Sequence, residues 1–138
     1  MDREIQLKYS EMLEIAKKYM NNAYAPYSNI HVGSAVLSKS GKIYGGCNVE
    51  NASYGLTNCA ERVAIQKMVS EGDLSFKAIL IISDQEDFLY PCGACRQVMT
   101  EFAKEDPIIF VVSGKNEKLE IHRLSSLIPY SIKKENIK

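Results

Sequence analysis

Two short segments of the chain carry side chains that can bind a metal ion and move protons. Cys59 and Glu61 stand two positions apart in the first segment, and Cys92 and Cys95 form a CxxC pair after Pro91 in the second. A CxxC pair alone fits a zinc site, redox chemistry or two residues near a helix start. The third cysteine beside a carboxylate favours zinc, because thiolates bind zinc well and a nearby carboxylate can act as general base and acid.

Three cysteines predict a zinc site with one position left open. A structural zinc site normally has four protein ligands, whereas a catalytic site has three and keeps the fourth place for water or substrate. Both cysteine segments begin predicted helices, where unpaired N–H groups and the helix dipole favour the thiolate form. Zinc with three thiolates carries net negative charge, so we expect Arg62 or Arg96 to offset it by donating hydrogen bonds to sulfur.

The predicted elements place both segments on helices that pack against a sheet. Asn58 is a favourable N-cap for the helix that follows it. Helical spacing of apolar residues predicts helices over 5–19, 59–69, 93–104 and 124–128. Apolar runs and turn residues predict strands over 32–37, 43–49, 78–82, 108–112 and 119–121.

The order of these elements predicts a three-layer α/β domain. Five strands alternate with helices, so helices are expected on both faces of the sheet. The chain has 138 residues, of which 46% are hydrophobic and 25% charged, the balance of an ordinary soluble globular protein. We find no internal repeat or linker, and we therefore expect one domain over residues 1–138.

The charge and the termini argue against nucleic acid, membrane and export. Lys plus Arg equals Asp plus Glu, 17 of each, whereas proteins that grip phosphates carry a basic excess. No apolar run approaches the roughly 20 residues that span a bilayer, and the first residues lack a secretory signal. A cytoplasmic, reducing location is expected, in which the four cysteines are thiols or metal ligands and not disulfides.

Several segments together resemble the free-nucleoside cytidine deaminases, in the form whose zinc is held by three cysteines. The resemblance runs from about residue 24 to residue 130 and is specific because the motifs occur together. The matching segments are Cys59-Ala60-Glu61-Arg62, Pro91-Cys92-Gly93-Ala94-Cys95-Arg96-Gln97, Tyr24-Ala25-Pro26-Tyr27-Ser28, Val32-Gly33 and Gly46-Cys47-Asn48-Val49-Glu50-Asn51-Ala52.

The resemblance implies a fold and an activity. The fold would be the three-layer α/β/α cytidine deaminase-like fold with a mixed five-stranded sheet. The activity would be hydrolysis of cytidine, and of deoxycytidine, to the uridine product and ammonia, with one Zn²⁺ per chain, in pyrimidine salvage. The family also implies a homotetramer in which a neighbouring chain helps to close each pocket.

The resemblance also implies roles for single residues. Cys59, Cys92 and Cys95 would be the zinc ligands, Glu61 the proton carrier, and Arg62 a hydrogen-bond donor to the ligand sulfur. The substrate-binding residues would be Asn48, Val49, Glu50 and Ala60, with Asn48 and Glu50 on the ribose hydroxyls and the Ala60 backbone on the cytosine amine. Ile30 and Ile132 stand where the family usually has phenylalanines that pack on the pyrimidine, which leaves the preferred substrate open.

Three other interpretations remain open at this point. The first is a deaminase for another aminopyrimidine nucleoside or a nucleoside antibiotic, which the loss of both aromatics keeps in view. The second is a non-catalytic zinc-binding module, which would need Cys47 as a fourth ligand. The third is a redox protein built on Cys92 and Cys95, which leaves Cys59 and Glu61 without a role.

Overall fold

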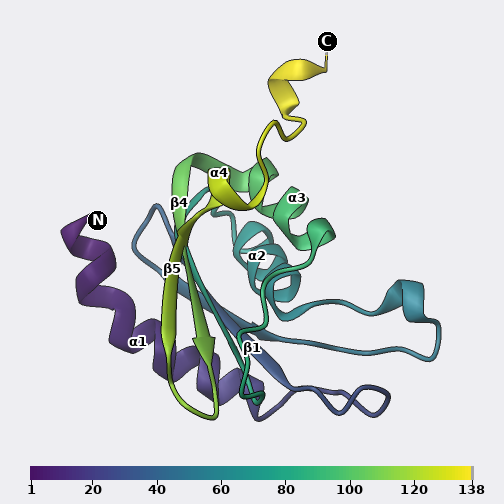
Figure 1. Ribbon diagram of the computed structural model, residues 1–138. Helices are drawn as coiled ribbons and strands as arrows, with labels where there is room; N and C mark the ends of the chain where they lie inside the picture. The colour runs from purple at the N-terminus through teal and green to yellow at the C-terminus, as the bar shows by residue number, and fades with distance from the viewer. Residues whose placement is uncertain (138) are drawn as a thin grey trace.

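A central sheet with helices on both faces forms the body of the protein (Figure 1). The computed structural model describes residues 1–137, and within them the strands are β1 (Val32–Ser38), β2 (Ile43–Cys47), β3 (Phe76–Ser83), β4 (Ala103–Ser113) and β5 (Leu119–Arg123). The helices are α1 (Arg3–Met20), α2 (Ala60–Ser70), α3 (Gly93–Phe102) and α4 (Leu124–Leu127), with short 3₁₀ turns η1 (Tyr54–Leu56) and η2 (Lys134–Asn136).

The five strands form one mixed sheet, as predicted. Their order is β2-β1-β3-β4-β5. The central strands β3 and β4 are parallel, and every other neighbouring pair is antiparallel. Because β3 and β4 run the same way, the connection between them crosses one face of the sheet and contains α3.

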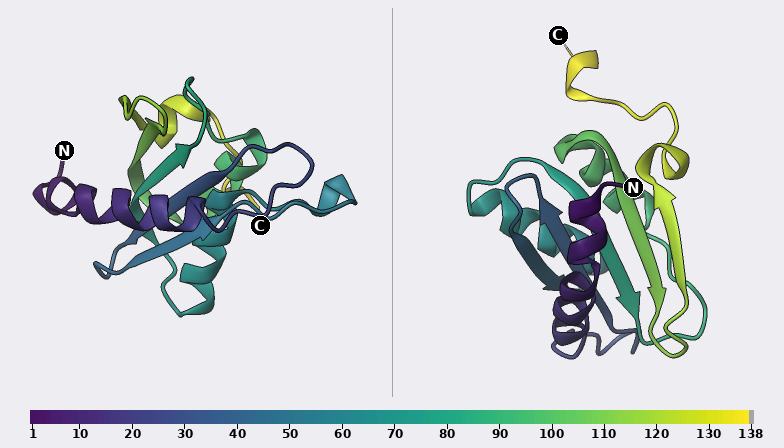
Figure 2. Two further views of the ribbon diagram at one scale, coloured as in Figure 1. Left: turned by 90° about the horizontal axis from the view of Figure 1, so that it is seen from below. Right: turned by 90° about the vertical axis from the view of Figure 1, so that its left-hand side faces the viewer.

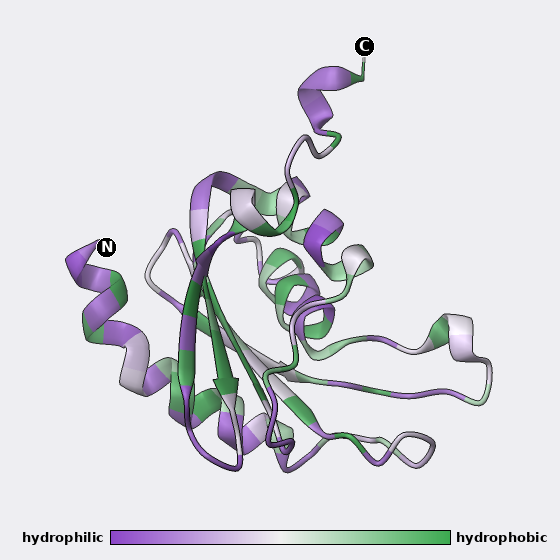
Figure 3. Ribbon diagram, viewed as in Figure 1, coloured by the Kyte–Doolittle hydropathy of each residue, from purple (hydrophilic) through white to green (hydrophobic). Residues whose placement is uncertain are grey.

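The apolar run in β3 is buried on both of its faces. Ile79 and Ile81 point into a core shared with α2 and α3. Leu80 and Ile82 point into a second core, which α1 covers on the opposite face. Figure 2 shows the two helical layers on either side of the sheet, and Figure 3 shows the apolar residues concentrated in its central strands. The three-layer prediction is therefore confirmed.

The start of α2 differs from the prediction by one residue. The N-cap is Cys59, which has an extended backbone, and not Asn58. Both backbone groups of Asn58 pair with Val49, at 2.9 Å in each direction, so Asn58 continues an extended segment. Long-range backbone pairing therefore overrides the capping preference of asparagine, and it puts a thiol at the helix start.

Two other elements end earlier than predicted. α3 stops at Phe102, because Ala103 already begins β4 and lies opposite Phe76 of β3. β2 ends at Cys47, since Val49 leaves the ladder to pair with the segment before α2. Neither change moves a predicted metal ligand out of its helix start.

Close approach of the helices depends on two glycines in the sheet. A Cβ added to Gly33 would lie 1.9 Å from the carbonyl oxygen of Ala16 in α1. A Cβ added to Gly46 would lie 2.6 Å from the backbone nitrogen of Ala64 in α2. α2 can therefore reach the sheet only because β2 has no side chain at this point. No helix in the described part of the chain is both long and apolar enough to cross a membrane.

Candidate active site

The three predicted ligand thiols come together at the starts of two neighbouring helices. Cys59 is the N-cap of α2, Cys92 is the N-cap of α3, and Cys95 lies in the first turn of α3. All three Sγ atoms lie within 4.8 Å of one another. The Cys59–Cys92 distance is 3.9 Å and the Cys92–Cys95 distance is 3.3 Å.

This spacing fits a tetrahedral zinc site. With Zn–S bonds of about 2.3 Å, two ligand sulfurs are about 3.8 Å apart. Among the described residues, the group consists of Cys59, Cys92 and Cys95 and does not extend to Cys47. The closed site that a non-catalytic zinc module needs is therefore disfavoured, because its fourth sulfur lies elsewhere. Three protein ligands are the number found in catalytic zinc sites.

Arg62 lies against the first thiol. Its Nη2 donates to Cys59 Sγ at 3.3 Å and to the Thr57 carbonyl at 3.5 Å. In the metal-free chain, a hydrogen bond from the Cys95 thiol, together with the Arg62 guanidinium, lowers the pKa of Cys59 to about 5. The same contact with Cys59, reinforced by burial, raises the pKa of Cys95. Zinc binding must therefore release the Cys95 proton.

Glu61 is a buried residue in the first turn of α2, two positions after Cys59. Only 4% of the residue is exposed. Burial, and next the negative charge of Cys59, raises the pKa of Glu61 to about 7. A carboxyl group with a pKa near neutrality both accepts and donates a proton readily at physiological pH, which is what a shared acid and base needs.

A cavity of about 260 Å³ joins these groups. Its lining residues include Cys59, Cys92 and Glu61. The remaining lining residues come from the loops before β1, α2 and α3, from the first residues of β1 and α2, and from β3: Ser28, Ile30, Val32, Asn48, Glu50, Thr57, Ala60, Ile81, Leu89 and Tyr90.

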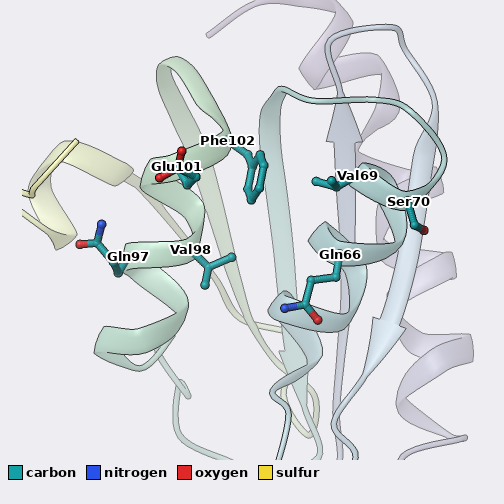
Figure 4. A pocket seen from close by; sticks show the side chains of 7 residues that line it. All are labelled: Gln66, Val69, Ser70, Gln97, Val98, Glu101 and Phe102. Carbon is teal, nitrogen blue, oxygen red and sulfur yellow. The ribbon is translucent and has the colours of Figure 1, made fainter. Parts of the chain in front are cut away.

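A larger hollow of about 470 Å³ lies between the C-terminal halves of α2 and α3 (Figure 4). It is lined by side chains such as Val69, Val98 and Phe102, with Glu101 as its one ionisable group among the described residues. It contains no thiol and no pair of acid and base groups. We therefore place the chemistry in the smaller cavity, where the metal ligands and Glu61 meet.

Asn48 and Glu50, both predicted to bind substrate, line the cavity and also form hydrogen bonds that stabilise the loop before β1. The Asn48 amide accepts from the Val32 N–H at 2.9 Å and donates to the Ile30 carbonyl at 2.8 Å. Glu50 accepts the Ser28 hydroxyl at 2.5 Å and the backbone N–H groups of Tyr27 and Ser28. Hydrogen bonds from the Ser28 hydroxyl and the two N–H groups lower the pKa of Glu50, so the carboxylate is charged at neutral pH.

Other predicted residues are placed differently. Val49 does not line the cavity, since its side chain is exposed and its backbone pairs with Asn58. Arg96 donates to the carbonyls of Pro91 and Leu127, both at 2.7 Å, so the expectation that it bonds to sulfur is wrong. Ile132 is 57% exposed on the C-terminal segment and does not line the cavity of its own chain.

Sequence reasoning missed several cavity residues. Leu89 and Tyr90 line the cavity from the loop before Pro91, and Ile81 lines it from β3. The one available signal was their position: Leu89 and Tyr90 directly precede the second cysteine motif, and Ile81 lies at the carboxyl end of a central strand. Ser28 ends one of the matching segments and Thr57 lies two residues before Cys59, but only the folded arrangement shows that they line the cavity.

The chain is similar to known proteins over most of its length. Residues 7–111 match the family model described as the cytidine and deoxycytidylate deaminase zinc-binding region. A cytidine deaminase from Sporosarcina psychrophila is 42% identical over 92% of this chain and 93% of its own length. The crystal structure of cytidine deaminase from Burkholderia pseudomallei has a TM-score of 0.84 and 39% identity, covering 90% of this chain and 98% of that one. A blasticidin-S deaminase from Bacillus cereus is 32% identical over 86% of this chain and 88% of its own.

Proposed function

The chain belongs to the family of zinc-binding cytidine and deoxycytidylate deaminases, and from that premise we propose how its residues deaminate cytidine. The reaction consumes water, releases the exocyclic amine as ammonia and leaves uridine, or deoxyuridine from deoxycytidine. One observation carries the assignment: three thiols have the spacing of zinc ligands, and two of them, Cys59 and Cys92, line the same cavity as the buried Glu61.

Cys59, Cys92 and Cys95 would hold one Zn²⁺ per chain. When bound, zinc acidifies water and so supplies a nucleophile near neutral pH. Arg62 draws negative charge away from Cys59 through its hydrogen bond, which limits the loss of acidity that three thiolates cause. The helix starts at Cys59 and Cys92 add their positive dipole ends to the same effect.

Glu61 moves the protons in this proposal. It takes a proton from the attacking water and delivers it to ring nitrogen N3. It then takes the proton of the new C4 hydroxyl and passes it to the departing amine, so that C4 becomes a carbonyl and ammonia leaves. Because burial raises the carboxyl pKa to about 7, Glu61 both accepts and releases a proton at neutral pH. Ala60, buried beside Glu61 and lining the cavity, would present its backbone to the cytosine amine.

Asn48 and Glu50 would bind the ribose hydroxyls with the hydrogen-bonding capacity that the fold leaves free. The Asn48 amide uses one N–H and one lone pair on the backbone of Ile30 and Val32, so a second N–H and a second lone pair remain. Among the described residues, Glu50 Oε2 accepts only the Ser28 hydroxyl and keeps lone pairs for a ligand. Val49 would act by holding these two side chains at a fixed spacing.

We further propose a cytoplasmic homotetramer that serves pyrimidine salvage and whose pockets are shared between chains. Support comes from the segments around residues 21–31 and 48–59, which project from one end of the sheet (Figure 1). Two apolar side chains at the tip of the second segment are largely exposed: Tyr54 is 75% exposed and Leu56 is 70% exposed. A neighbouring chain would cover them.

A second candidate substrate class has an observation in its favour. Ile30 lines the cavity with an aliphatic side chain, and the chain is similar to a blasticidin-S deaminase as well as to cytidine deaminases. An aminopyrimidine antibiotic is therefore the alternative to cytidine at the same zinc site. Parallel assays of cytidine, deoxycytidine and blasticidin S, compared by kcat/KM, separate the two.

The proposal is tested by measuring ammonia release from cytidine together with zinc content. We expect about one zinc per chain and activity in the unaltered protein. Glu61→Gln should lower kcat by about 10²- to 10⁴-fold, the usual contribution of general acid–base catalysis, with zinc content unchanged. Near-full activity in Glu61→Gln would show that the proton carrier is assigned wrongly.

A further inference from the structure

An aromatic side chain that the proposed chemistry does not use lies at the cavity wall. Tyr90 lines the cavity two residues before Cys92. Of the described residues around the cavity, it alone is aromatic, whereas Ile30, Val32, Ile81 and Leu89 give the rest of the apolar surface. The residue is 43% exposed, so its ring is not held in place by burial.

Instead, two side chains of the edge strand β5 hold this ring. The Tyr90 hydroxyl donates to Glu120 Oε1 at 2.7 Å. The same carboxylate oxygen lies 2.9 Å from His122 Nε2. The His122 ring stands edge-on to the Tyr90 ring with centroids 5.8 Å apart, and the centroids of the Phe88 and Tyr90 rings are 6.3 Å apart.

The hydrogen bond to Glu120 connects the Tyr90 ring to the central sheet. β5 pairs with β4 from Ile108 to Val112, so Glu120 and His122 stand on the sheet and not on a loop. Their side chains fall on one face of β5 because residues two apart in a strand point the same way. An exposed tyrosine held by a sheet-borne carboxylate and an imidazole loses rotamer freedom before a ligand arrives, which is the condition for efficient aromatic contact.

We propose that Tyr90 packs against the pyrimidine base in the cavity as a specificity-determining residue, and that Glu120 and His122 are positioning residues that hold it there. This inference rests on the proposed function of the same cavity. The base end is assigned because Tyr90 is two residues from the metal ligand Cys92, whereas the sugar end is assigned to Asn48 and Glu50. Aromatic packing needs a planar ring and depends little on the ring's substituents. Contact with Tyr90 therefore favours planar aminopyrimidines as a class.

The test is steady-state kinetics with cytidine on four variants and a matched control. Tyr90→Ala should raise KM about 5- to 100-fold, the range for loss of one base–aromatic contact, with a smaller change in kcat. Tyr90→Phe and Glu120→Ala should raise KM about 2- to 5-fold, because the ring stays but is no longer tethered. Glu120→Gln keeps an oxygen acceptor for the hydroxyl and should restore KM to within about twofold of the unaltered protein.

Tyr44→Phe is the matched control. It removes a tyrosine–carboxylate hydrogen bond of the same kind, Tyr44 to Asp73 at 2.5 Å, away from the cavity, so KM should not change. Zinc content and melting temperature of Tyr90→Ala are measured alongside. Unaltered zinc and a raised KM support the inference. A KM within twofold of the unaltered protein, or loss of zinc from Tyr90→Ala, overturns it and leaves the deaminase assignment standing. If the unaltered protein deaminates no aminopyrimidine nucleoside, the proposed function itself fails.

Discussion

Burial and hydrogen bonding give chemically ordinary side chains different tasks in this site. Glu61 is nearly inaccessible and its pKa rises to about 7, whereas Glu50 is bonded to Ser28 and its pKa falls. One carboxyl group is thereby suited to proton transfer and the other to remaining charged. The sequence predicted both as functional, but it could not separate the two electrostatic environments. That difference depends on which distant groups surround each carboxyl.

Arg62 offers a test of charge tuning at a single residue. Arg62→Gln should lower zinc affinity or kcat by about 10- to 100-fold, since it removes the guanidinium donor to Cys59 Sγ at 3.3 Å. Zinc affinity by competition with a chromogenic chelator and kcat with cytidine measure the effect. Arg123→Gln is the control, because its guanidinium bonds only the Asp106 carbonyl among the described residues. Equal, small effects in both variants would rule out a special role for Arg62.

Predicting side-chain partners from spacing succeeded for one arginine and failed for the other. Arg62 follows Cys59 by three positions in the same helix, so a local contact was foreseeable. Arg96 stands one position after Cys95 and therefore points to a different side, toward the carbonyls of Pro91 and Leu127. The Leu127 partner comes from α4, whose position no local pattern reveals.

The fit between α2 and the sheet governs the site at the level of whole elements. α2 carries Cys59, Glu61 and Arg62, and it sits on β2 where Gly46 has no side chain. The order of helices and strands was predictable because hydrophobic periodicity marks each one. The pairing of Asn58 with Val49 and the early start of β4 were not, because both depend on long-range backbone hydrogen bonds.

Gly46→Ala should therefore damage stability and metal binding together. The added Cβ would meet the Ala64 backbone at 2.6 Å, so α2 must shift, at a cost of about 1–3 kcal/mol in the free energy of unfolding. Because Cys59 moves with α2, zinc affinity should fall as well. Urea denaturation and zinc titration measure the two effects. Gly55→Ala, whose added Cβ has open space within the chain, should leave zinc affinity unchanged. A fully stable Gly46→Ala protein with tight zinc would contradict this packing argument.

At the scale of the whole molecule, the prominent feature is the projecting segment around η1. It leaves Tyr54 and Leu56 largely uncovered, and the C-terminal segment extends away from the body on another side (Figure 1). The overall fold and its family could be predicted because the motifs are specific when found together. The association of chains could be expected only from the resemblance, since exposed apolar side chains are identified only once the fold is known.

We expect the protein to sediment as a tetramer, at about four times the 15.5 kDa of one chain. Leu56→Glu should shift the equilibrium toward smaller species and lower activity, because it places a charge in the proposed contact. Sedimentation velocity over a range of concentrations measures this shift. Leu7→Glu, an equally exposed position on α1, is the control and should leave the sedimentation coefficient unchanged. A monomer that is fully active would refute shared pockets.

The alternation of side chains along β3 has an evolutionary consequence. Ile81 lines the cavity, whereas its neighbour Leu80 belongs to the core beneath α1. Ile81 also packs in the core with α2 and α3, so a mutation there changes the cavity and that core together, whereas Leu80 affects only the core beneath α1. A combinatorial library at Ile30, Val32 and Ile81 would vary the shape of the cavity while leaving the α1 core intact. Stability retained in the α1 core then offsets the packing lost when the cavity adapts to a new substrate.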